Sequence, residues 1–266
     1  MLRDLEYARV GEKRLLLDLY LPEQAQAPVP LIIWVHGGAW QSGDKAGHIP
    51  ALALLTTRAY AVASINYRLS QEVTFPAQIH DCKAAVRWLR ANARDYNLDP
   101  ERFGAWGSSA GGHLVALLGT SAGVKELEGD LGNLEQSSRV QAVCDWFGPT
   151  DFLKMGAFPS RIDRTKPDCP EALLVGGLLE ERKELCQQAN PITYVTAKSP
   201  PFLIMHGDQD DIVPFNQSEL LHDALKQAGA EVTFHPVKGA GHGFARPELD
   251  EMVVSFFDKH LKGDKP

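Results

Sequence analysis

A serine flanked by glycines stands where a predicted strand turns into a predicted helix. Residues 107–111 read Gly-Ser-Ser-Ala-Gly and match the pattern G-x-S-x-G; they follow the apolar run 103–106 and precede a helical pattern over 110–118. Glycines at both ends relieve crowding in such a turn, which exposes the Ser109 hydroxyl, and the helix N-terminus favours developing negative charge. Glycine and serine are common, so the five letters alone could arise by chance. The strand-turn-helix setting favours Ser109 as a nucleophile for acyl transfer.

A histidine is needed beside this serine, because a hydroxyl is a poor nucleophile until a base removes its proton. The sequence has nine histidines, and a packed or surface position is the plainer interpretation of any one of them. His242 differs because it lies late in the chain, in the glycine-rich loop 239–244 that follows the predicted strand 232–236. The others end a strand, begin the acidic loop described next, follow Ser109 by one helical turn or fall inside predicted elements. We therefore predict His242 as the base.

Three carboxylates compete to orient that histidine. Asp208, Asp210 and Asp211 all lie in the loop 206–214, directly after the apolar run 202–205. The chain order of serine, acid and histidine is one that parallel-sheet hydrolases use. Charge does not select among the three aspartates, because all share one loop. An aspartate that does not serve the histidine most plainly stabilises the turn or is solvated.

A glycine pair ends an early apolar strand. Residues 36–40 read His-Gly-Gly-Ala-Trp, and glycines let the main chain approach a substrate closely. Acyl transfer requires backbone N–H groups aimed at the oxygen of the tetrahedral intermediate. We predict the N–H of Gly38 as one donor, Ala39 as a further candidate, and the N–H of Ala110 as the donor that follows the nucleophile. The plainer alternative is a simple turn that ends a strand.

Apolar runs and helical patterns alternate along the chain, which is typical of a doubly wound α/β sheet, mostly parallel, with helices on both faces. Ligands of such sheets bind beyond the carboxyl ends of the strands, where the serine, acid and histidine segments all fall. The predicted strands are 15–21, 31–35, 61–65, 103–106, 140–146, 202–205 and 232–236, and the predicted helices are 49–58, 76–96, 110–118, 215–228 and 248–260.

One segment, residues 150–199, breaks this alternation. It mixes prolines and glycines with short apolar pieces such as Phe152, Leu153 and Phe158. Connections of this length inside compact domains are usually functional, so we predict a small cap or lid over the carboxyl edge of the sheet. A plain surface connection is the alternative. We expect residues 1–266 to form a single domain that carries this insertion.

Composition limits the classes of partner. The formal net charge is -7 at pH 7, and no block of lysine and arginine offers the basic surface that nucleic acid requires. No apolar segment has the length of an export signal or a membrane span. We therefore expect no nucleic-acid or membrane partner and a cytoplasmic location for the chain as given. Removal of a signal peptide would leave the same sequence, so a secreted or periplasmic location is the alternative.

The four cysteines lie far apart and lack the close pairs of a zinc site, so we expect no metal. Cys82 and Cys144 fall in a predicted helix and a predicted strand and are most simply buried thiols. Cys169 and Cys186 lie in the insertion. They would be bridged only in an exported protein, and the sequence leaves their state open.

Four motifs together carry a resemblance that covers nearly the whole chain. They are residues 36–40, the Asn-Tyr-Arg-Leu at 66–69, the stretch 107–113 and the loop 206–214. The chain resembles the esterase branch of the α/β-hydrolases, most nearly the compact bacterial carboxylesterases of the feruloyl-esterase-like group, close to the hormone-sensitive-lipase and kynurenine-formamidase relatives. In similar families the acid is the aspartate four residues after the histidine of His-Gly-x-x-Asp, which here is Asp210.

Two residues depart from the lipase branch of this fold. That branch commonly has a third glycine where this chain has Ala39, and an acidic residue where it has Ser108. Backbone donors survive the first change. The second change favours the feruloyl-esterase-like group over the lipase branch itself.

The resemblance implies a carboxylic ester hydrolase that needs no metal or organic cofactor. Ser109 would attack the ester, His242 would transfer the proton, and Asp210 would orient the imidazole. The expected substrates are small-molecule esters with short-chain or aryl acyl groups of the hydroxycinnamoyl type. An amidase or formamidase with the same triad is the alternative, followed by a non-catalytic binding module on this fold. The acyl and alcohol groups and the oligomeric state stay open.

Three aromatic residues are candidates for an apolar acyl or aryl pocket. Trp40 lies beside the predicted oxyanion turn, and Trp146 and Phe147 follow one another at the end of a predicted strand. Pockets for small ligands are mostly lined by apolar and aromatic side chains. Ordinary core packing is the alternative for all three.

Overall fold

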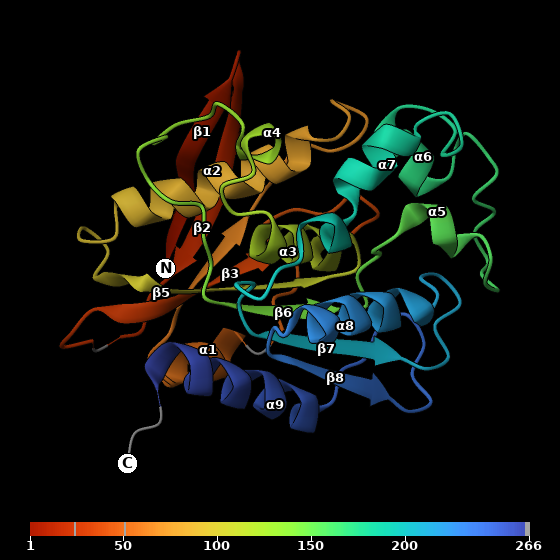
Figure 1. Cartoon of the computed structure of the whole chain (residues 1–266). Helices are drawn as coiled ribbons and strands as arrows, with labels where there is room; N and C mark the ends of the chain where they lie inside the picture. The colour runs from red at the N-terminus through yellow and green to blue at the C-terminus, as the bar shows by residue number, and fades with distance from the viewer. Residues whose placement is uncertain (24, 51, 264–266) are drawn as a thin grey trace.

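A sheet of eight strands runs through the described part of the computed structural model, which comprises residues 1–263 without 24 and 51 (Figure 1). The strand order is β1-β2-β4-β3-β5-β6-β7-β8. The strands from β3 to β8 are parallel, whereas β2 pairs antiparallel with both β1 and β4. The predicted mostly parallel sheet is therefore confirmed. The strands are β1 (Leu2–Val10), β2 (Lys13–Tyr20), β3 (Val29–Val35), β4 (Ala61–Ile65), β5 (Leu98–Ser108), β6 (Ala142–Trp146), β7 (Phe202–Gly207) and β8 (Val232–Val237).

Helices cover both faces of this sheet, as predicted (Figure 1). One face packs against three helices, α2 (Ala77–Ala91), α3 (Ala110–Thr120) and α8 (Asn216–Ala228). The other face packs against α1 (Leu52–Thr57) and α9 (Pro247–Phe257). The short helix α4 (Lys125–Glu128) follows α3, and a π-helical turn, η2 (Asp258–Lys262), continues α9.

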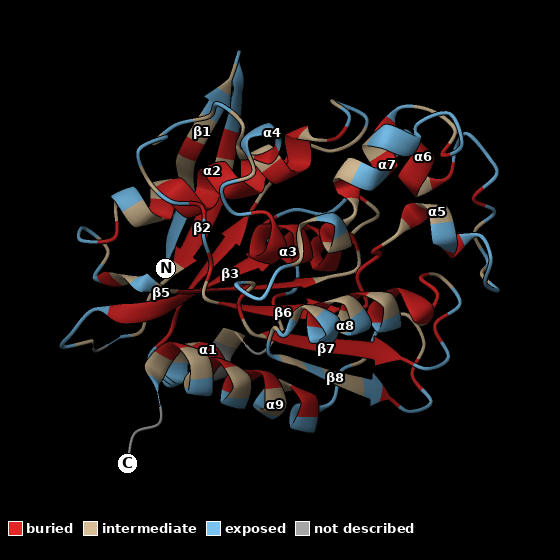
Figure 2. Ribbon diagram, viewed as in Figure 1, coloured by how far each residue is buried: buried red, intermediate tan, exposed pale blue. Residues whose placement is uncertain are grey.

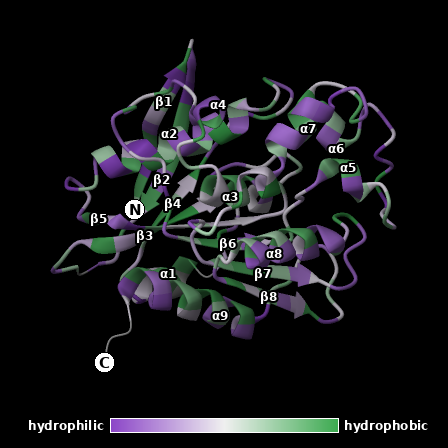
Figure 3. Cartoon of the chain, viewed as in Figure 1, coloured by the Kyte–Doolittle hydropathy of each residue, from purple (hydrophilic) through white to green (hydrophobic). Residues whose placement is uncertain are grey.

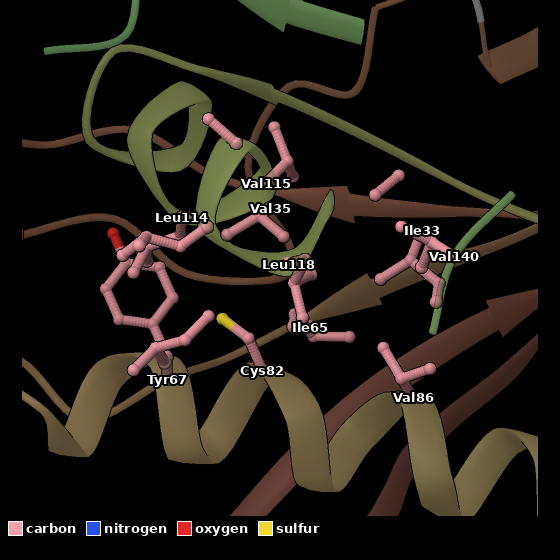
Figure 4. Close-up of a cluster of buried hydrophobic side chains, with 14 of the residues drawn as sticks. Ile33, Val35, Ile65, Tyr67, Cys82, Val86, Leu114, Val115, Leu118 and Val140 are labelled. Carbon is pink, nitrogen blue, oxygen red and sulfur yellow. The ribbon is translucent and has the colours of Figure 1, made fainter. Parts of the chain in front are cut away.

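Strand β3 shows how the sheet is buried on both faces. All of its residues are buried, and successive side chains point to opposite faces. Ile33 and Val35 join the cluster with α2 and α3, whereas Ile32 and Trp34 join the cluster with α1 and α9. Figure 4 shows the first cluster, in which side chains of α2, α3 and β3 meet. Figures 2 and 3 show that the central strands combine the deepest burial with apolar composition, as expected for a parallel sheet that is covered on both sides.

The strand β1 is the largest addition to the predicted elements. It pairs with β2 at one edge of the sheet, and most of its residues are exposed or half-buried. Its sequence, LRDLEYARV, carries four charged side chains, so it lacks the continuous apolar run by which the buried strands are recognised. The strand β5 also begins at Leu98, five residues before its apolar run.

The insertion 150–199 contains only short helices among its described residues. They are α5 (Phe152–Met155), α6 (Pro170–Val175), α7 (Lys183–Ala189) and the 3-10 helix η1 (Pro191–Tyr194). In Figure 1, α5, α6 and α7 gather on the side of the molecule toward which the arrows of β7 and β8 point. The insertion therefore lies toward the carboxyl edge of the sheet.

All four cysteines are free and buried. The thiol sulfur of Cys169 lies 3.9 Å from the carbonyl oxygen of Arg164, and that of Cys186 lies 3.8 Å from the carbonyl oxygen of Leu179. Cys169 and Cys186 are thus not bridged in this structure.

Candidate active site

The backbone at Ser109 is strained. The residue lies between the end of β5 and the start of α3, with φ 55° and ψ -122°, a conformation that side chains other than glycine rarely adopt. The glycines on either side fit because they have no side chain. A Cβ at Gly107 would overlap the carbonyl oxygen of Gly111, and a Cβ at Gly111 would overlap that of Val35. The turn therefore holds the serine above the end of β5.

Ser109, His242 and Asp210 form one hydrogen-bonded chain. The Nε2 of His242 lies 2.9 Å from the Oγ of Ser109, and its Nδ1 lies 2.7 Å from the Oδ2 of Asp210. Because Asp210 can only accept when ionised, we assign the ring proton to Nδ1, which leaves Nε2 free to accept the proton of Ser109. The three residues follow β5, β7 and β8, and parallel strands bring their carboxyl ends to one edge of the sheet.

Four hydrogen bonds converge on the carboxylate of Asp210. Its Oδ1 accepts from the backbone N–H groups of Ile212 and Val213, and its Oδ2 is hydrogen-bonded to the rings of His206 and His242. Burial acts to raise the pKa of Asp210, but the hydrogen bonds from His206 and His242 and the backbone outweigh it and hold that pKa well below its ordinary value. Asp210 is therefore ionised at neutral pH.

The other two acids of the loop have different partners. Asp208 accepts a hydrogen bond from the N–H of Gly239 at 2.7 Å, which joins the acidic loop to the loop of His242. Asp211 forms an exposed ion pair with Arg161 of the insertion. The structure thus brings Asp210, and neither of its neighbours, to the histidine.

The loop after β3 runs alongside the serine. A Cβ at Gly37 would lie 3.3 Å from the Cβ of Ser109, and the following residues Gly38 and Ala39 have φ values of 108° and 56°. Within the described ranges, no protein acceptor is hydrogen-bonded to the N–H of Gly38, Ala39 or Ala110. These amides are thus available to a ligand oxygen at the predicted positions.

The three predicted pocket aromatics are all buried, with 1%, 4% and 6% exposure for Trp40, Trp146 and Phe147. Trp40 packs edge-on against His113 and Trp146 packs against neighbouring aromatic rings. Of the three rings, that of Phe147 packs against His242, with 4.8 Å between the ring centroids. A pocket role for all three residues remains a prediction.

A histidine that sequence reasoning set aside, His206, belongs to the site. It is fully buried, and its ring links the Oδ2 of Asp210 to the hydroxyl of Ser218 on α8. The four-residue spacing from His206 to Asp210 is the available sequence signal, because a turn of that length can fold the carboxylate back onto the ring.

A cavity of about 530 Å³ lies within the insertion, and we call it the cap pocket. Ser109, Asp210 and His242 are not among its lining residues, but two of its walls contact the elements next to them. Phe152 packs against Trp40 of the loop after β3 and against His113 of α3, and Arg161 pairs with Asp211 of the acidic loop. Its lining combines apolar and polar residues, namely Phe152, Leu153, Gly156, Phe158, Pro159, Ser160, Arg161, Ile162, Asp163, Arg164, Thr165, Leu178, Leu179 and Glu180.

The described residues contain neither a metal-binding cluster nor a membrane-spanning helix. No group of three or more histidine, cysteine or acidic side chains is arranged to hold a metal ion. None of the helices in this part of the chain has the length and apolar character needed to cross a membrane.

Comparisons with known proteins agree with one another. The family model BD-FAE matches residues 17–225. Esterase LipC of Mycobacterium tuberculosis is 32% identical over 239 residues, which are 86% of this chain and 57% of LipC. The chain spans about half the length of the curated relatives it matches.

Among solved structures, a truncated carbohydrate esterase from gut microbiota superposes with a TM-score of 0.89 at 37% identity, covering 98% of this chain and 95% of that one. Esterase 2 of Thermogutta terrifontis, phosphoramylated by tabun, superposes with a TM-score of 0.79 at 26% identity, covering 99% and 96%.

Proposed function

This chain belongs to the BD-FAE family, and from that membership we propose that it is a serine-dependent carboxylic ester hydrolase of the α/β-hydrolase fold. The observation that carries the proposal is the hydrogen-bonded chain from Ser109 through His242 to Asp210, beside backbone N–H groups that have no described protein acceptor. The relatives support it by name, since they are esterases and ester hydrolases.

The reaction proceeds in two halves. Ser109 attacks the ester carbonyl while His242 takes its proton, and the N–H groups of Gly38 and Ala110 stabilise the oxyanion. Asp210 holds the imidazole and stabilises the imidazolium. His242 then protonates the leaving alcohol, and the acyl group stays on Ser109. Water, deprotonated by His242, attacks this acyl-enzyme and releases the carboxylic acid.

An esterase is favoured over an amidase or a binding module. The relatives reported above are esterases, which supports ester rather than amide hydrolysis. The esterase of Thermogutta terrifontis that carries the tabun group supports a reactive nucleophile in this fold. A binding module would have no need of a serine, a histidine and an ionised aspartate within hydrogen-bond distance of one another.

The substrate is an ester with a short or flat acyl group, and the cap pocket accommodates part of it. This pocket is bounded by short helices and by loop residues such as Phe158 and Ile162, from which we infer a shallow pocket rather than a long channel. Each CH₂ of an acyl chain gains about 0.8 kcal/mol only where it is buried. Long chains therefore gain little here. The structural neighbour that is a carbohydrate esterase makes acetylated and feruloylated sugars the first natural-type substrates to test.

The experiment has two parts. A fluorophosphonate probe should label the wild-type protein on the peptide that contains Ser109, as read by mass spectrometry. A series of p-nitrophenyl esters from acetate to palmitate, run beside methyl ferulate and p-nitroacetanilide, should give the highest kcat/KM with acetate or butyrate and little hydrolysis of the anilide. Absence of labelling would contradict the serine mechanism. A kcat/KM that rises steadily to palmitate would contradict the shallow pocket.

A further inference from the structure

The three residues after Asp145, Trp146 to Gly148, contact two members of the proposed triad, and we call them the β6 turn. The N–H of Ser109 donates to the carbonyl oxygen of Trp146 at 2.8 Å. The ring of Phe147 lies edge-on to that of His242, with 4.8 Å between centroids and 62° between planes. Phe147 has a φ of 44°, a left-handed conformation that a bulky residue keeps only when its surroundings impose it. Contacts from other residues must therefore stabilise the conformation of the β6 turn.

The carboxyl of Asp145 makes one of these stabilising contacts. Its Oδ1 accepts the N–H of Gly148 at 2.9 Å and closes the turn. The same oxygen fits tightly against α3, because a Cβ at Gly112 would overlap it and a Cβ at Gly148 would lie 2.6 Å from it. A Cβ at Gly148 would also lie 2.5 Å from the backbone nitrogen of His113. The carboxyl is thus wedged between the β6 turn and the first turn of the helix that follows Ser109.

Asp145 is an unusual residue for a central strand. It is 1% exposed, and its Oδ2 has no hydrogen-bond partner in the described part of the chain. Burial raises the pKa of Asp145 to about 7, although the hydrogen bond from Gly148 acts in the opposite direction. An apolar residue, such as its neighbour Val143, would avoid the cost of burying a carboxyl that lacks a charged partner. We therefore attribute the presence of a carboxyl at this position to the β6 turn that it holds.

We propose that Asp145 is a positioning residue for ester hydrolysis, because its carboxyl locks the β6 turn against α3 and thereby fixes the backbone of Ser109 and the ring of His242. This inference rests on the proposed function. Without the acceptor, Gly148 loses its hydrogen bond, and the left-handed conformation of Phe147 loses one support beside the hydrogen bond from its N–H to the carbonyl oxygen of Met205. The carbonyl of Trp146 and the aromatic wall of His242 then shift together. A displacement of the order of 1 Å in reacting groups lowers rates about a hundredfold.

Four variants test the proposal. Asp145→Ala and the similarly shaped Asp145→Leu remove the acceptor, and Asp145→Asn keeps an acceptor at Oδ1 in a neutral side chain. Val143→Ala is the control, because it removes part of a buried side chain of the same strand that packs beside Gly119 at the far end of α3. Two quantities are measured on each folded variant. One is the exchange rate of the Ser109 amide hydrogen, followed by NMR. The other is the second-order rate constant for labelling by a fluorophosphonate, with the melting temperature recorded alongside.

We expect Asp145→Ala and Asp145→Leu to lower the labelling rate about a hundredfold and to accelerate exchange at Ser109 selectively. Asp145→Asn should restore both quantities to near the wild-type values. Val143→Ala should lower the melting temperature and leave both quantities unchanged. If Asp145→Ala does not fold, the comparison of Leu with Asn carries the same test.

The proposal is overturned if the Ala or Leu variant of Asp145 loses only thermal stability, as is expected of Val143→Ala, or if Asp145→Asn behaves like Asp145→Leu. Failure of the proposed function has a different signature. In that case the wild-type protein is not labelled, while the exchange rate at Ser109 still reports whether Asp145 holds the β6 turn.

Discussion

The interior of the sheet and its carboxyl edge differ in how the backbone is held. In β3, residues 31–35 pair in register with a strand on each side and are all buried. Just beyond, Gly38, Ala39 and Trp40 have φ values of 108°, 56° and 58°, and Ser109 has 55° where β5 ends. Such left-handed residues cost roughly 1–3 kcal/mol each when they are not glycine, and they persist where the surrounding structure imposes them. The regular, buried strands thus hold the residues at the carboxyl edge in these unfavourable conformations.

The two regions meet at glycine contacts, and the clearest is Gly111. Its Cα lies so close to the ends of β3 that a Cβ would overlap the carbonyl oxygen of Val35. Helix α3 therefore sits directly on the sheet, and Ser109 at its start inherits that fixed position. Substitutions at the edge and at its contact with the interior therefore separate the contributions of the two regions.

Removal of the attacking oxygen should affect the edge alone. Ser109→Ala takes away one atom from a residue whose backbone contacts stay in place. We expect kcat for p-nitrophenyl acetate to fall roughly a million-fold, as when a triad nucleophile is removed elsewhere, with an unchanged circular dichroism spectrum. Near-normal turnover by this variant would refute the proposed nucleophile.

The acidic loop distinguishes one carboxylate from its neighbours. Asp210→Asn keeps the loop shape but deprives His242 of its charged partner, so we expect kcat to fall about ten-thousand-fold. Asp208→Asn is the matched control. It weakens a hydrogen bond to Gly239 but leaves the partner of His242 intact, and should cost much less. A larger effect of the Asp208 variant would identify that residue as the acid.

Gly111→Ala should break the contact between the interior and the edge. The added Cβ would overlap the backbone of β3, and overlap with main chain that cannot move is among the few causes of destabilisation above about 4 kcal/mol. Gly156→Ala provides the control, because that glycine has a helical φ and no atom within 4 Å of a built Cβ. Urea unfolding of both variants measures the difference. Equal stability of the two would show that α3 is not pressed onto the sheet.

The pH dependence of stability should reveal the buried carboxyl of Asp145. Burial raises its pKa from the ordinary value of 3.8 to about 7 in the folded protein. Below pH 4 both states are protonated. Between about pH 4 and pH 7 only the unfolded state ionises, so stability falls as the pH rises, by up to roughly 4 kcal/mol, and then levels off. The difference in unfolding free energy between wild type and Asp145→Asn at pH 5 and pH 8 measures this. Parallel curves for the two proteins would refute the raised pKa.

The sheet interior could be predicted from sequence far better than the edge. Each strand from β3 to β8 contains a short apolar run that announces it, and the predicted α/β-hydrolase resemblance is confirmed by the family match and the structural neighbours. The strand β1 is not predicted from the sequence, because four of its nine side chains are charged. Tyr7 is the one buried residue of β1, so this strand has no apolar run.

The predicted site residues came from local motifs, and the residues that support them did not. The choice of Asp210 over two equal neighbours required a resemblance, because the loop sequence alone does not determine which carboxylate faces His242. His206 and Asp145 contact residues from other strands and helices, and no local sequence pattern records such contacts. Trp40 lies beside the oxyanion loop in sequence, but its indole packs on His113 instead of facing open space.

The proposed triad residues lie far apart along the chain, so the rate of ester hydrolysis should report local unfolding of any segment that carries one of them. Ser109 and His242 are 133 residues apart, and His242 follows β8, the outermost strand, which pairs only with β7 among the described strands. Edge elements open at lower free energy than the centre of a fold. Fraying of β8 would withdraw the histidine while the central strands stay intact. In a denaturant titration, hydrolysis should therefore disappear before the circular dichroism of the sheet does, and the gap between the two midpoints reports how firmly the last strand is attached.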